Sequence, residues 1–94
     1  MLEKEIEKAV CDYAKGRGWL TYKFVSPGRA SVPDRLFLSP VGKCVFIEFK
    51  REGKKPTEAQ AREHDRLREQ KVSVFVVDNV ADGKAIVDVM GWEV

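Results

Sequence analysis

Glu48 and Lys50 are the residues whose types and spacing point most directly to chemistry. They stand two positions apart in segment 43–50, whose apolar residues indicate a central β-strand, so their side chains share one face of the sheet. A carboxylate and an ammonium group on a buried strand cost free energy unless they pair with each other or bind a metal ion. Two plainer interpretations stay open: the strand could end near Ile47 and leave both side chains in solvent, or the two could form a simple ion pair.

Asp34 supplies a second carboxylate, fourteen residues before Glu48. It follows Pro33 near the start of another predicted strand, 32–38, where a proline is tolerated because its missing N–H is not needed by the ladder. In an antiparallel pair with a short turn, the start of one strand faces the end of the next, so we expect Asp34 near Glu48 and Lys50. The alternative is an aspartate that bonds its own backbone in a turn. Two carboxylates and a lysine at neighbouring strand ends indicate a metal-ion site more specifically than either motif alone.

The rest of the pattern predicts an α/β fold that can hold those strand ends together. Three strands joined by short connections can form an antiparallel meander, and a fourth that follows a helix can join by a crossover. We therefore expect an αβββαβ core, with a mixed four-stranded sheet flanked by helices, in one domain over residues 1–94. The predicted elements are helix 3–17, strands 19–25, 32–38 and 43–50, helix 56–70, strand 72–77 and a short terminal helix within 80–90.

The composition is that of an ordinary globular protein, with 44% hydrophobic and 34% charged residues. A chain of 94 residues buries a thin core, so an oligomeric partner can contribute to its stability. No apolar stretch approaches the length of a membrane span, and the N-terminus lacks the features of a signal peptide, so we expect an intracellular, cytoplasmic protein. Cys11 and Cys44 fit a helix and a strand pattern, and we expect both to be small buried hydrophobes.

The net charge of +2 is too small to identify a partner, but the charge is unevenly distributed. Residues 15–35 carry five basic side chains against Asp34 alone. Residues 72–94 carry one lysine against four acidic side chains. One part of the surface is therefore expected to attract polyanions, with a solvated basic loop as the alternative.

Two strings carry a resemblance to a known family: Val-Pro-Asp at 32–34 and Phe-Ile-Glu-Phe-Lys at 46–50. They are similar to the motif of the PD-(D/E)XK nuclease superfamily, which has the restriction-endonuclease-like fold. The likeness runs from residue 3 to about 77, and the αβββαβ core of that superfamily agrees with the order predicted from the residues alone. Four further segments look like its VRR-NUC branch, and most like standalone, phage-type members: 3–10, 18–20, 27–28 and 56–60.

The resemblance implies a divalent-metal site whose residues can be assigned one by one. Asp34 and Glu48 would ligate Mg²⁺ or Mn²⁺, which prefer oxygen ligands in near-octahedral geometry, with the main-chain carbonyl of Phe49 as a third protein ligand. Lys50 would orient or help deprotonate the attacking water, or stabilise charge on the phosphorane. Gln60 matches the glutamine of the family's second helix, where it would bind a phosphate or hold a ligand in place.

Glu3 matches the acidic residue that such nucleases place on the first helix. It is expected to share the inward face of Ile6 and Val10. Glu7 is the weaker candidate for this role, because it lies toward the side of the helical face formed by Ile6 and Val10. Either glutamate could instead be a helix-start charge that complements the helix dipole.

His64 is the only histidine, and it lies on one helical stripe with Gln60 and Leu67. We expect this stripe to face the sheet, so that Gln60 can point toward the metal site. His64 itself is expected to be a packed or half-exposed helical residue. A single histidine argues against a nuclease of the histidine–metal type.

The function that the resemblance implies is a metal-dependent, structure-specific DNA endonuclease, acting inside the cell and encoded by a phage. Cleavage of branched, Holliday-junction-like DNA by a homodimer is the sharper expectation, since two sites could then cut two strands. Flap or nicking activity, a non-catalytic DNA-binding module on a nuclease fold, and an unrelated interaction domain are the alternatives.

Substrate recognition is expected to follow DNA shape, because the sequence contains no helix-turn-helix or zinc finger. Phosphate contacts would position the nucleic acid and make its affinity depend on salt. The loop 26–31 is the expected substrate-contacting loop. The basic residues expected to contact phosphates on loops beside the site are Arg29, Arg35, Arg51, Lys54 and Lys55, with Lys23 in the same cluster.

Overall fold

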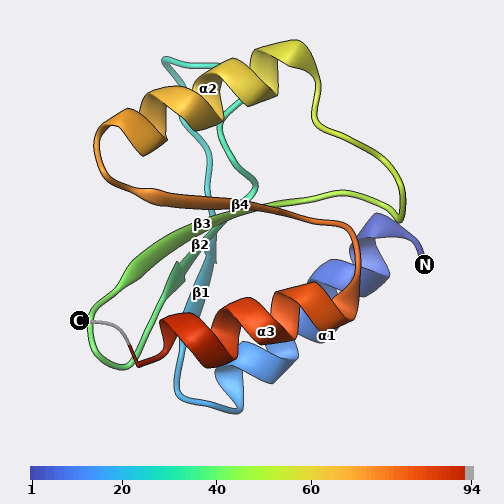
Figure 1. Cartoon of the computed structure of the whole chain (residues 1–94), viewed down its shortest axis with the longest axis vertical. Helices are drawn as coiled ribbons and strands as arrows, with labels where there is room; N and C mark the ends of the chain where they lie inside the picture. Colours follow the sequence, from blue (N-terminus) through green and yellow to red (C-terminus); the bar gives the residue numbers. More distant parts are fainter. Residues whose placement is uncertain (93–94) are drawn as a thin grey trace.

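A mixed four-stranded sheet lies at the centre of the structure, a computed structural model that describes residues 1–92 (Figure 1). Helix α2 lies on one face of the sheet, and α1 and α3 lie side by side on the other. The elements are α1 (Glu3–Lys15), β1 (Leu20–Lys23), β2 (Arg35–Leu38), β3 (Cys44–Phe49), α2 (Glu58–Glu69), β4 (Ser73–Val77) and α3 (Val80–Met90). The predicted αβββαβ order is confirmed, and α3 follows it. Within the described residues, no helix is long and apolar enough to span a bilayer.

The strands lie in the order β1-β2-β3-β4, so the chain builds the sheet from one edge to the other. β1, β2 and β3 form an antiparallel meander, and β4 joins β3 in parallel after the crossover through α2. The register places Arg35 opposite Ile47. The start of β2 therefore lies beside the end of β3, as the sequence predicts.

The hydrophobic core lies between the sheet and the layer formed by α1 and α3. Ile6, Val10 and Ala14 have no exposed surface, and their spacing places them on one face of α1. Because side chains alternate across a strand, Glu48 points to the opposite face, toward α2. The side chains of the sheet that are fully buried in this core are Phe37, Val45, Ile47, Phe49 and Val77.

β2 begins at Arg35, three residues later than the predicted strand 32–38. Pro33 has no N–H to donate to a ladder, and Ser31 adopts a left-handed backbone conformation with φ of 66°. Asp34 therefore stands just outside the strand, where its side chain can bond to the neighbouring chain.

The two cysteines lie in different environments, and both thiols are free. Cys11 is buried in the core, as predicted. Cys44 is exposed, so the expectation that both are buried is wrong. Cys44 is the first residue of β3, on the sheet face where α2 packs mainly against β4 and leaves the strand end uncovered.

Candidate active site

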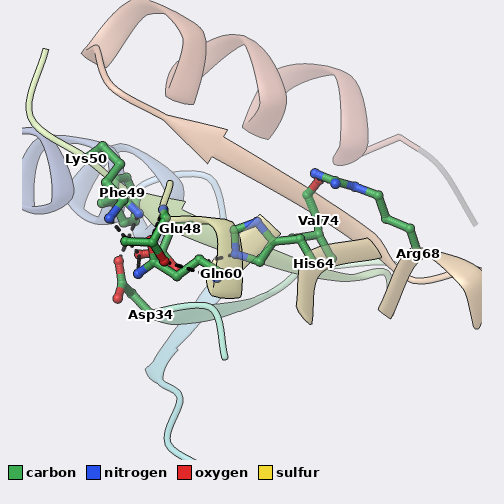
Figure 2. A network of polar contacts seen from close by, with 9 residues as sticks. Asp34, Glu48, Phe49, Lys50, Gln60, His64, Arg68 and Val74 are labelled. Atoms are coloured by element: carbon green, nitrogen blue, oxygen red, sulfur yellow. Dashed lines mark hydrogen bonds and ion pairs between the residues drawn. The ribbon is translucent and has the colours of Figure 1, made fainter. Parts of the chain in front are cut away.

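Main-chain hydrogen bonds hold Asp34 and Lys50 at adjoining strand ends. The Phe49 N–H donates to Asp34 Oδ2 at 2.9 Å, and the Phe24 N–H donates to the Asp34 carbonyl at 2.9 Å. The Lys50 N–H donates to the Val77 carbonyl at 2.9 Å. The bond from Phe49 to Asp34 joins the two motifs that the sequence singles out (Figure 2), and the other two bonds connect them to Phe24, next to β1, and to β4.

Glu48 lies at the centre of this cluster, with only 2% of its surface exposed. Its Oε2 is 4.0 Å from Lys50 Nζ and accepts a hydrogen bond of 3.4 Å from Gln60 Nε2 (Figure 2). Its Oε1 is buried, has no hydrogen-bond partner within residues 1–92, and lies 3.5 Å from His64 Nε2. A buried carboxylate oxygen without a donor is costly, so this arrangement favours a cation that is supplied from outside the chain.

The charges around Glu48 oppose its ionisation. Burial, followed by the negative charge of the neighbouring Asp34, raises the pKa of Glu48 to about 8, against the opposing effect of Lys50. Burial also lowers the pKa of His64, which favours the neutral imidazole. A bound cation would favour the ionised form of Glu48 and so oppose the effect of the Asp34 charge on it.

The donor set fits a small divalent cation. Asp34 and Glu48 offer carboxylate oxygens, and Mg²⁺ is commonly held by one or two carboxylates while it keeps several waters. Within residues 1–92, no group of three or more His, Cys, Asp or Glu side chains is arranged to bind a metal. The oxygen donors at these strand ends are two carboxylates, to which Phe49 would add a main-chain oxygen.

The N-terminus of α2 orients Gln60 toward Glu48. Thr57 caps the helix: its hydroxyl accepts from the Gln60 N–H at 3.1 Å, and its own N–H donates to Gln60 Oε1 at 2.9 Å. With Oε1 held in this way, the Gln60 amide nitrogen points at Glu48. Gln60 thus donates to the buried Glu48 carboxylate from the first turn of α2.

His64 is part of the site, a role that the sequence analysis did not give it. It is packed, as expected, with 1% of its surface exposed, but its imidazole faces Glu48. The signal was available, since His64 follows Gln60 by one helical turn and must lie on the same face of α2.

Glu3 and Glu7 occupy different environments on α1. Glu7 forms an ion pair with Arg35. Glu3 has no ion pair within the described part of the chain, and its charge contributes to raising the pKa of Glu48. Glu3 is exposed although Ile6 is fully buried, because Glu3 begins the helix. Of the two glutamates, the geometry favours Glu3 as the one available to the site.

Comparison with known proteins places this chain in a family. No family model matches it. It is 48% identical over 77 residues to a curated protein, "Putative nuclease p44" of Acyrthosiphon pisum secondary endosymbiont phage 1, covering 82% of this chain and 83% of that protein. A solved VRR_NUC domain superposes with a TM-score of 0.84 at 32% identity, covering 92% of this chain and 94% of the other.

This chain belongs to the VRR-NUC family. The VRR-NUC resemblance and the restriction-endonuclease-like fold class predicted from the sequence are confirmed by this match. A second solved structure, a VRR_NUC domain protein, has a TM-score of 0.74 at 14% identity and covers 94% of this chain and 86% of the other, which supports the fold alone.

The predicted phosphate-contacting residues of this VRR-NUC chain fall into two groups. Arg29 pairs with Glu63 at 2.7 Å, and Arg35 is paired with Glu7. Arg35 and Lys23 also lie on strands, not on loops as predicted, because the meander continues through both positions. Arg51, Lys54 and Lys55 are exposed, and the first two line a groove that also contains Lys50.

Proposed function

We propose that this VRR-NUC chain is a divalent-metal-dependent deoxyribonuclease that hydrolyses phosphodiester bonds beside Asp34, Glu48 and Lys50. The observation that carries the proposal is the buried Glu48 carboxylate, which has one oxygen without a donor beside a second carboxylate and a lysine. A plain ion pair between Glu48 and Lys50 does not account for that oxygen, since Lys50 approaches the other one.

Asp34, Glu48 and the Phe49 carbonyl would hold Mg²⁺ or Mn²⁺. Such an ion, when bound, supplies a Lewis acid for the phosphoryl group and lowers the pKa of water. Lys50, with 12% of its side chain exposed, can reach the site from the groove and offer positive charge to the attacking water or to the phosphorane. Gln60 keeps the Glu48 carboxylate in place through its hydrogen bond.

The proposed substrate is branched DNA, cut by a homodimer. Leu20 and Tyr22 support the dimer: both are 52% exposed, and they lie on the same face of the edge strand β1. Exposed apolar side chains that gather on one face favour contact with another chain. Two copies would supply two sites for the two strands of a junction.

A cleavage panel tests this proposal. Single-stranded, duplex, flap and four-way-junction DNA are incubated with the protein in Mg²⁺, Mn²⁺ or chelator. We expect metal-dependent cutting with preference for the junction, and a loss of about 10²-fold or more in Glu48→Gln and Lys50→Ala. Glu52→Gln, which removes an exposed carboxylate from the adjoining loop, should cut like the wild type.

The outcomes of the panel are distinct. Cutting of every substrate by Glu48→Gln at the wild-type rate would place the chemistry elsewhere. Preferential cutting of flap DNA, or nicking of one strand, would replace the junction as the proposed substrate and leave the proposed active site unchanged. Sedimentation of the same sample measures its oligomeric state. A monomer at the assay concentration would overturn the proposed homodimer.

A further inference from the structure

Two surface grooves border α1 and meet at Lys4. The first groove contains Lys50 of the candidate active site, together with Glu3, Lys4 and Lys54. The second lies between α1 and the strands β1 and β2 and begins at the same Lys4. The surface that leads away from the candidate active site therefore continues along the first helix.

The second groove is strongly basic. It is lined by five cationic side chains and only two acidic ones, Glu7 and Asp12, which leaves a formal excess of three positive charges. We call this second groove the α1 groove. Its five cationic residues are Lys4, Lys8, Lys15, Lys23 and Arg35.

The pairing of these charges shows which of them are available. Arg35 is paired with Glu7, and both side chains are largely buried at the floor of the groove. Lys8 pairs with Asp12 at 2.6 Å, but both are exposed, and such a pair contributes little to stability. Lys4, Lys15 and Lys23 are exposed and have no ion pair among residues 1–92, so these three side chains carry the excess charge.

The spacing of these lysines suits an extended polyanion. Lys4, Lys8 and Lys15 are separated by four and seven residues, so they lie along one side of α1. Lys4 and Lys15 are about 16 Å apart along the helix, which corresponds to about five base-pair steps of duplex DNA. A row of exposed lysines at this spacing can contact successive phosphates without reading bases.

We propose that the α1 groove binds the phosphate backbone of one arm of the nucleic acid, away from the bond that is cut. The proposal rests on the proposed nuclease function, because the groove leads from Lys50. An anionic membrane surface is the competing class of partner. The groove favours nucleic acid because it meets, at Lys4, the groove that contains Lys50 of the candidate active site, whereas a membrane would require a broad basic face.

Binding in chelator tests this groove without cleavage. The anisotropy of a labelled four-way junction is measured over a range of salt concentrations, for the wild type and for Lys15→Gln/Lys23→Gln. We expect affinity to fall about 10-fold at low salt and the slope of log K against log salt to fall by about 2, since each phosphate contact contributes about 0.9. The matched control is Lys71→Gln/Lys84→Gln, which removes the same charge from exposed positions outside both grooves.

The outcomes distinguish the proposed α1 groove from the proposed nuclease function. Wild-type affinity and slope in Lys15→Gln/Lys23→Gln would overturn the groove while leaving the nuclease proposal intact, and so would an equal loss in the control. If the groove variant cuts at the wild-type rate at saturating protein but binds weakly, both claims hold. If the wild type cuts no DNA yet the groove variant binds more weakly, the nuclease proposal fails and the groove stands. Unchanged DNA affinity together with reduced binding to anionic vesicles would assign the groove to a membrane.

Discussion

At the scale of single residues, Glu48 carries an electrostatic conflict. Its carboxylate is buried beside Asp34, and both of these factors, together with a contribution from Glu3, raise its pKa to about 8 against the attraction of Lys50. The folded-state pKa lies above the ordinary value of 4.5, so folding takes up a proton between these limits. Without a cation, the contribution of the Glu48 carboxyl to stability is full below about pH 4.5 and is lost as the pH rises through about 8.

Glu48→Gln should therefore stabilise the metal-free protein while abolishing its chemistry. The amide keeps the shape of the side chain and removes the charge. In chelator at pH 7, we expect its unfolding temperature to exceed that of the wild type by about 4 °C or more, equivalent to about 1 kcal/mol. The difference should shrink as the pH falls below about 4.5, where the wild-type carboxyl becomes protonated in both states.

Thermal unfolding in chelator at the two pH values checks this prediction, with Glu52→Gln as an exposed control that should match the wild type. A Glu48→Gln protein less stable than the wild type at pH 7 would show that the carboxylate contributes to stability as a plain ion pair with Lys50. That result would remove the physical reason for a cation.

At the scale of elements, one local contact at the start of α2 and two contacts between segments far apart in the chain hold the fold around the site. Thr57 at the start of α2 orients Gln60. Arg29, in the connection between β1 and β2, is joined to α2 by its 2.7 Å pair with Glu63. On the other side of the sheet, α1 must lie close to α3, and Gly83 permits this because a Cβ there would stand 2.4 Å from a methyl carbon of Val10.

Gly83→Ala should destabilise the fold, although alanine is the better helix former. The added methyl group would overpack the contact between α1 and α3 at a cost of about 1–3 kcal/mol. Gly28→Ala is the matched control, because a Cβ at Gly28 meets nothing within 4 Å. Chemical denaturation measures both; a Gly83→Ala protein as stable as the wild type would mean that the two helices can separate freely at this contact.

At the scale of the whole molecule, local sequence patterns predict the fold well. Alternation and helical spacing are local properties, and the short connection between β2 and β3 leaves an antiparallel pair as the natural arrangement. That pairing brings Asp34 to Glu48 and Lys50, so this cluster could be predicted without a structure.

Features that depend on packing between distant elements could not be predicted in the same way. The exposure of Cys44 depends on where α2 packs across the sheet, and the pairing of Arg29 with Glu63 depends on how a loop meets that helix. His64 could be assigned to a buried face, but its proximity to Glu48 required the position of α2 over β3. The basic groove joins residues of α1 to Lys23 and Arg35 on two strands, so no single segment of sequence reveals it.

The central claim is that the buried Glu48 and the half-buried Asp34 together hold a divalent cation. Calorimetric titration of the metal-free protein with Mn²⁺ at pH 7 tests it most directly, because it requires neither a substrate nor turnover. We expect saturable heat in the wild type and in Glu52→Gln, and loss of that heat in Asp34→Ala and in the folded Glu48→Gln protein. Absence of saturable heat in the wild type, or full retention of it in Glu48→Gln, would contradict the claim.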